Sequence, residues 1–163
     1  MARSHARKRR PSGPASREED LIARAEAAMA QLSTHFAGWM KDECRRLDRI
    51  CRHAEADRSD AGAFNELIRA AHDIKGEAAT FGFPTVERIA ASLHRLASLA
   101  PDRAQIPFDL VRRHVSAAHE AARLHREDEA LAAELERASA AVLEKAGVTL
   151  YPEVKAPPLA PGA

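Results

Sequence analysis

The sequence predicts an all-α protein, and three observations support that prediction. Alanine, the strongest helix former, occupies 36 of the 163 positions. Aromatic residues, which favour strands, make up only 4% of the chain. Apolar residues recur at spacings of three and four through most of the sequence, which is the periodicity of amphipathic helices. Long helices with short connections pack as antiparallel neighbours, which predicts an up-and-down helical bundle.

Prolines mark the expected ends of this helical body, because proline disrupts a helix interior but is tolerated in the first turn. Six of the nine prolines lie near the two ends of the chain, and the other three fall where helical periodicity starts or stops. We therefore expect a basic disordered tail over residues 1–17, a helical bundle over 18–147 and a proline-rich tail over 148–163.

The first half of the body contains three amphipathic stretches. One runs over residues 21–32, and a second follows Ser33-Thr34 over residues 36–54. The four polar residues 57–60 predict a turn that ends in an N-cap. The third stretch runs over about 61–81, and Gly82 is expected to end it as a helix C-cap.

Three further stretches complete the body. The fourth has the most regular apolar face and runs over 84–100, with proline at its start and Pro101 after its end. Pro107 opens a fifth stretch that extends to about residue 122. The sixth runs over about 128–146, and Gly147 predicts its end.

The charge distribution separates the N-terminal segment from the body. The net charge is +1, yet residues 1–17 carry six basic residues and no acidic one. The remaining 146 residues carry 19 basic and 24 acidic side chains, which disfavours a nucleic-acid footprint across the body. A solvated tail is the favoured interpretation of the basic segment, and contact with nucleic acid or anionic lipid is the alternative.

No stretch of the chain predicts a membrane span or a secretory signal. A membrane-spanning helix needs about 18 or more apolar residues, and no such run occurs. The basic start is followed by Pro11–Pro14 instead of an apolar segment, which favours a cytoplasmic protein. Cys44 and Cys51 are seven residues apart on one predicted helix, a rise of about 10.5 Å. Because a disulfide needs Cα atoms within about 7 Å, we expect both thiols to be reduced.

The histidines and cysteines do not have the spacing of a metal site. His119 and His125 are six residues apart, which places them about 240° apart on a helix. Cys44, Cys51 and His53 match no zinc-ligand spacing. A structural role at a surface or half-buried position is therefore favoured for seven of the eight histidines: His5, His35, His53, His94, His114, His119 and His125.

The eighth histidine, His72, lies in a different setting. On a helical wheel it falls at the edge of the apolar face, with Lys75, Gly76 and Ala79 around it. Glycine at mid-helix costs about 1 kcal/mol relative to alanine, and clearance for an approaching partner is a physical reason to keep it. A lysine beside a histidine disfavours protonation of the ring, but it would stabilise a phosphoryl dianion carried by that ring.

Residues 71–82 resemble the signature of histidine phosphotransfer (HPt) domains. The matching features are His72, a lysine three residues later, a glycine four residues later, small residues after it and Gly82 at the helix end. The match is good over residues 64–96, and elsewhere it rests on the lengths and order of the helices.

The resemblance implies an up-and-down antiparallel four-helix bundle with one or two accessory helices. It also implies a phosphorelay protein of two-component signalling. His72 would accept a phosphoryl group from the aspartyl phosphate of a receiver domain and pass it to another receiver, with no kinase activity of its own. Lys75 would stabilise the phosphoryl group, and Gly76, Ala79 and Ile68 would give clearance for the docked receiver. The chain itself would need no metal or other cofactor, because the Mg²⁺ belongs to the receiver. The implied partners are receiver domains of response regulators or hybrid histidine kinases, and the implied state is a monomer.

Three residues depart from the family pattern. Glu77 replaces a small residue and lies 140° from His72 on the wheel, Asp73 adds a negative charge beside His72, and His94 stands where glutamate is common. Asp73 and Glu77 leave open a receiver-binding adaptor or phosphate sink on the same fold. A structural helical bundle whose basic tail binds nucleic acid is the other alternative.

Overall fold

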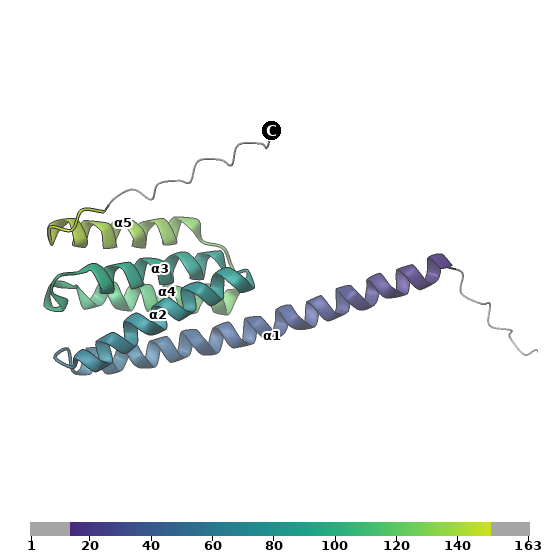
Figure 1. Ribbon diagram of the computed structural model, residues 1–163, viewed down its shortest axis with the longest axis horizontal. Helices are drawn as coiled ribbons and strands as arrows, with labels where there is room; N and C mark the ends of the chain where they lie inside the picture. Colours follow the sequence, from purple (N-terminus) through teal and green to yellow (C-terminus); the bar gives the residue numbers. More distant parts are fainter. Residues whose placement is uncertain (1–13, 151–163) are drawn as a thin grey trace, which may run out of the picture. The chain divides into compact units, whose positions relative to one another are not determined.

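The computed structural model describes residues 14–150 of the chain, with side chains from residue 17 onward. All regular structure in these residues is helical, which confirms the predicted all-α class (Figure 1). None of the helices in this range is both long and apolar enough for a membrane span. The elements are α1 (Pro14–Ala56), α2 (Ala61–Phe81), α3 (Pro84–Leu99), the short 3-10 helix η1 (Arg103–Gln105), α4 (Phe108–Leu124) and α5 (Glu129–Lys145).

The chain divides into two compact units, residues 1–36 and 37–163, and each is described by itself. In the first unit the described residues belong to α1, which begins at Pro14, inside the range expected to be a tail. Ser33-Thr34 does not interrupt α1, and the Thr34 hydroxyl donates to the Ala30 carbonyl at 3.0 Å within the helix. The apolar stripe expected to face a core is exposed: Leu21, Ile22, Met29 and Leu32.

The core of the second unit lies between the C-terminal part of α1 and helices α2 to α5. Helix α3 packs against α2, α4 and α5, and α4 also packs against α5 (Figure 1). Helix α1 contacts α2 through Trp39 and Phe81, whose ring centroids are 5.3 Å apart. It contacts α4 through the Cys44 thiol, which donates to the Ala118 carbonyl at 3.7 Å. Large side chains fill the space between these helices: Met40, Leu47, Leu67, Ile74, Ile89, Leu93, Leu96, Ile106, Leu135 and Leu143.

Local capping fixes the ends of α2, which is the helix that carries His72. The Asp60 carboxylate accepts from the backbone amides of Gly62 at 2.7 Å and Ala63 at 3.2 Å. At the other end Gly82 adopts φ of +79°, a left-handed conformation that favours glycine. Helix α3 then starts at Pro84. The predicted bounds of α2 are therefore confirmed, and His72 lies in the middle of the helix.

A buried polar network joins α3, α4 and α5 around His114. Its Nδ1 lies 2.8 Å from the Leu110 carbonyl, which can only accept, so Nδ1 carries the proton. Its Nε2 is then an acceptor, 3.0 Å from Ser92 Oγ and 3.2 Å from Ser139 Oγ. The Ser92 hydroxyl donates to Ser139 Oγ at 3.1 Å, which leaves the Ser139 hydroxyl to donate to the ring. Burial lowers the pKa of His114 and keeps the ring neutral. The prediction that His114 takes a surface or half-buried position is wrong, because the ring is fully buried.

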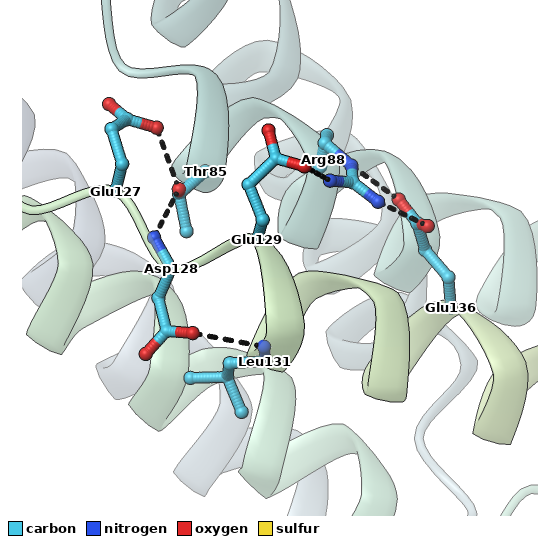
Figure 2. Close-up of polar contacts among 7 residues, drawn as sticks. All are labelled: Thr85, Arg88, Glu127, Asp128, Glu129, Leu131 and Glu136. Carbon is cyan, nitrogen blue, oxygen red and sulfur yellow. Dashed lines mark hydrogen bonds and ion pairs between the residues drawn. The ribbon is translucent and has the colours of Figure 1, made fainter.

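Arg88 connects α3 to α5 at the edge of the bundle (Figure 2). Its Nε and Nη2 donate to the two carboxylate oxygens of Glu136 at 2.9 and 2.8 Å, which is a bidentate pair. Its Nη1 reaches Glu129 at 3.3 Å. These side chains are partly exposed, so we expect a contribution of about 1 kcal/mol or less to stability.

Thr85 fixes the start of α5 against α3, and its substitution by valine tests that contact (Figure 2). The buried Thr85 hydroxyl donates to Glu127 at 2.9 Å and accepts from the Asp128 backbone amide at 2.9 Å. Because Thr85→Val leaves that amide without its partner, we expect the free energy of unfolding to fall by about 1–2 kcal/mol. In urea denaturation the exposed control Thr34→Val should change it by less than about 0.5 kcal/mol. Equal effects of the two variants would contradict this role of Thr85.

The two cysteines and the end of the described chain complete the second unit. Cys44 and Cys51 are free and buried, as predicted. Burial raises the pKa of the Cys44 thiol to about 12 and that of Cys51 to about 11, so both stay protonated at neutral pH. Val148 and Leu150, at the start of the expected C-terminal tail, pack against the core. The remaining parts of the two expected tails, residues 1–13 and 151–163, lie outside the described residues.

Candidate functional site

Helix α2 presents His72 to solvent on a rigid base. The residue before it, Ala71, is fully buried, and Ile74 is 1% exposed, so the helix is held to the core on both sides of the histidine. The His72 side chain itself is 64% exposed. Its Nδ1 lies 3.5 Å from a carboxylate oxygen of Asp73, the next residue. An imidazole held in this way can be approached from outside without any movement of the backbone.

A shallow groove lies beside His72, on the side of α2 that faces α1. Trp39 comes from α1 and is half-buried, and it packs edge-to-face against Phe81 at the end of α2. This gives the groove an aromatic wall next to a row of polar and small side chains. The residues that line it are Trp39, His72, Asp73, Gly76, Glu77, Thr80 and Phe81.

On the side of α2 that faces α3, the ring of His72 contacts the ring of His94. The ring centroids are 5.3 Å apart and the planes are tilted by 59°. His94 is half-buried, whereas His72 is exposed. Burial is the main cause that lowers the pKa of His94, and the nearby charges of His72 and Lys75 lower it further. The ring of His94 is therefore neutral at pH 7.

The other residues singled out from the sequence lie around His72 in different degrees of exposure. Lys75, Gly76 and Ala79 are exposed on the same helix. Lys75 makes no ion pair within residues 14–150, so its ammonium group is available to an incoming anion. Ile68 is half-buried and packs against the core, so only part of its side chain can meet a partner.

Glu77 lies closer to this site than its wheel angle suggests. Its side chain is half-buried and lines the same groove as His72, because the groove extends around α2 toward α1. One carboxylate oxygen, Oε2, is buried and makes no hydrogen bond. Burial raises the pKa of Glu77, and the charges of Glu43 and Asp73 raise it further. Protonation of Glu77 would therefore reduce the negative charge of the groove.

Substitution of Gly76 by alanine tests whether the site is shaped for a partner. An added Cβ would meet no atom within 4 Å, so packing within the protein does not require glycine. We expect Gly76→Ala to raise the free energy of unfolding by about 0.5–1 kcal/mol. For the phosphoryl transfer from a receiver that the sequence resemblance implies, we expect Gly76→Ala to slow the reaction by about tenfold or more, because small displacements of reacting groups are costly.

Gly38 provides the matched control for this variant. It is also an exposed glycine inside a helix with nothing within 4 Å of an added Cβ, and it does not line the groove. Gly38→Ala should stabilise the protein to a similar extent and leave transfer unchanged. Denaturation curves and transfer rates of the two variants should separate the two effects. An unchanged transfer rate in Gly76→Ala would contradict the assignment of Gly76 to partner clearance.

Sequence reasoning missed the two residues that other helices bring to the site, Trp39 and His94. A helical wheel places residues on a face of one helix, but it does not show which neighbouring helix lies beside that face. The departure of His94 from the family pattern was the one available signal. Within the described residues, no group of three or more histidine, cysteine, aspartate or glutamate side chains could hold a metal ion.

Comparison with known proteins places this chain in a family. The sequence model of the Hpt domain matches residues 19–145, which include α2 and the whole site, so the chain belongs to the Hpt domain family. This confirms the resemblance seen in residues 71–82. No curated protein and no solved structure matched the chain. Hpt domains carry out histidine phosphotransfer in two-component systems, and they interact with receiver domains.

Proposed function

We propose that this chain is a phosphorelay intermediate in which His72 accepts a phosphoryl group from one receiver domain and donates it to another. The observation that carries the proposal is the exposed His72 at the middle of α2, with Lys75 and Gly76 exposed within about one helical turn. The match to the Hpt domain over residues 19–145 supports it. All site residues come from one copy of the chain, so a monomer is sufficient for the reaction.

The contact between His72 and Asp73 supports an assignment of roles to the two ring nitrogens. A carboxylate can only accept, so the Nδ1 atom near Asp73 carries the proton and Nε2 keeps its lone pair. Nε2 attacks the phosphorus atom of the aspartyl phosphate, and the N–P bond forms as the O–P bond to the receiver breaks. The aspartate leaves as a carboxylate, and the Nδ1 proton stays on the ring. The reverse reaction with a second receiver returns the imidazole.

In this proposal Lys75 and the Mg²⁺ of the receiver both stabilise the negative charge of the phosphoryl group. A phosphoryl group on His72 would carry most of two negative charges, and the free ammonium group of Lys75 would pair with it. The Mg²⁺ that the transfer requires would be held by the receiver, and no step needs a metal or a nucleotide on this chain.

The groove and the exposed face of α2 would form the docking surface for the receiver. Gly76 and Ala79 leave clearance above the helix, Ile68 offers part of an apolar side chain, and the aromatic wall formed with Trp39 extends the surface toward α1.

Contacts link α1 to α2, α2 to α3, α3 to α4 and α4 to α1. We propose these four helices as the antiparallel bundle, with α5 as the accessory helix.

The proposal is tested by transfer between two receivers. A receiver phosphorylated on aspartate is mixed with the full chain, and a second, unphosphorylated receiver is then added. We expect label on this chain first and on the second receiver afterwards, as followed by intact mass at alkaline pH. Label that stays on the chain would instead identify a phosphate sink. Binding of the receiver without any label on the chain would identify an adaptor, for which the negative charges of Asp73 and Glu77 are the supporting observation.

A further inference from the structure

His94 combines three features that a purely structural histidine does not need. Its ring contacts the ring of His72 at a centroid distance of 5.3 Å. It is half-buried, and it is neutral at pH 7 because burial and the charges of His72 and Lys75 lower its pKa. Neither of its ring nitrogens has a hydrogen-bond partner within residues 14–150. A neutral imidazole with unused nitrogens therefore lies beside the residue to which we assign the phosphoryl group.

We propose that His94 takes up one proton when His72 becomes phosphorylated and then donates a charge-assisted hydrogen bond to the phosphoryl group. The inference rests on the proposed function of His72 and adds a second residue to the phosphorylated state. The proton comes from solvent and binds the His94 ring, and no bond of the phosphoryl group is made or broken by it. In the unphosphorylated protein His94 releases this proton again.

The electrostatics of the pair support this coupling. A phosphoryl group brings about 1.5–2 negative charges at neutral pH, and an opposite charge within about 4–6 Å favours the protonated form of a histidine. Before phosphorylation, the ammonium group of Lys75 and, in its protonated form, the ring of His72 act on His94 from α2, and Arg95 is the neighbour of His94 on α3. The phosphoryl dianion raises the pKa of His94, whereas burial, the protonated His72 ring and Lys75 lower it. Charge-assisted hydrogen bonds are about 2.8 Å long, so a ring in contact with His72 lies close enough to reach a phosphoryl oxygen.

The sign of the pH dependence follows from this change. The pKa of His94 is low in the unphosphorylated protein and higher in the phosphorylated one, so phosphorylation is coupled to proton uptake between these two pKa values. In that range a fall in pH favours the phosphorylated state relative to a variant that lacks His94. His94 would thereby make retention of the phosphoryl group sensitive to pH.

The test is the titration of His94 in the full chain before and after phosphorylation with phosphoramidate, a small donor that needs no receiver. Histidine ring resonances are followed by NMR between pH 5 and 9. We expect the pKa of His94 to rise by at least about one unit on phosphorylation, and the ³¹P resonance of the phosphohistidine to titrate with the same midpoint. The remote, exposed His53 is the internal control and should not shift.

Two variants complete the experiment. In His94→Gln the ³¹P resonance should lose this titration, and in His72→Gln treatment with phosphoramidate should leave the pKa of His94 where it is. An unchanged or lowered His94 pKa in a protein phosphorylated on His72 would overturn the inference and leave the relay function standing. Phosphorylation by phosphoramidate but by no receiver would contradict the relay function while the His94 titration still decides the inference. A His72 that takes no phosphoryl group from either donor would overturn both.

Discussion

Replacing His72 by glutamine is expected to abolish acceptance of a phosphoryl group from a phosphorylated receiver. Glutamine has no nucleophilic ring nitrogen, so no N–P bond can form at this position. The His72 side chain is 64% exposed, and the substitution should change the free energy of unfolding by less than about 0.5 kcal/mol. Label on the protein, measured by intact mass after mixing with the receiver, should fall to background.

His53 supplies the matched control for this experiment. Its side chain is 69% exposed, and its Nε2 lies 3.9 Å from a carboxylate oxygen of Asp60, much as His72 lies near Asp73. It is on α1 and does not line the groove. His53→Gln should therefore accept label like the unmodified protein. Label retained in His72→Gln, or lost equally in both variants, would contradict the assignment of His72.

Replacing His114 by alanine is expected to produce the largest loss of stability, about 3 kcal/mol. The substitution removes a fully buried ring, and it leaves the hydroxyls of Ser92 and Ser139 and the Leu110 carbonyl without that partner. The free energy of unfolding, measured in urea at pH 7, checks this value. His53→Ala is the control, because the side chain of His53 is 69% exposed on α1. A loss below about 1 kcal/mol in His114→Ala would contradict the structural role of the network.

The pH dependence of stability tests the same network. The pKa of His114 is lowered in the folded protein, whereas a histidine in the unfolded chain has a pKa of about 6.5. Below pH 6.5 the unfolded state therefore binds a proton that the folded state does not. The free energy of unfolding consequently decreases as the pH is lowered, until the pH reaches the pKa of His114 in the folded protein. His94, whose pKa is also lowered, contributes in the same direction. Because His114→Ala lacks the His114 contribution, its difference in stability from the unmodified protein should shrink between pH 7 and pH 5.

The helices and the exposed position of His72 were predictable because their signals are local. Asp60, Gly82 and Pro84 act on the backbone within a few residues, and they fix the end of one helix and the start of the next. The wheel angle of His72 follows from α2 alone. The continuity of α1 was not predicted, because Ser33-Thr34 indicates a break, whereas the Thr34 hydroxyl bonds within the helix and leaves it intact.

The surroundings of His72 could not be derived from the sequence in the same way. Trp39 and His94 reach the site from α1 and α3, and their positions depend on how those helices pack against α2. The burial of His114 depends likewise on α3, α4 and α5 together, since its partners Ser92 and Ser139 lie on different helices. Periodicity assigns each residue to a face of its own helix, and pairings between faces are set only by the packed core.

The most direct test of the central claim is to locate the phosphoryl group on the chain. The full protein is phosphorylated by a receiver, digested at alkaline pH, where phosphohistidine is stable, and its peptides are sequenced by mass spectrometry. The relay function predicts one phosphoryl group, on His72. A phosphoryl group on another residue, or none after several receivers have been tried, would contradict it.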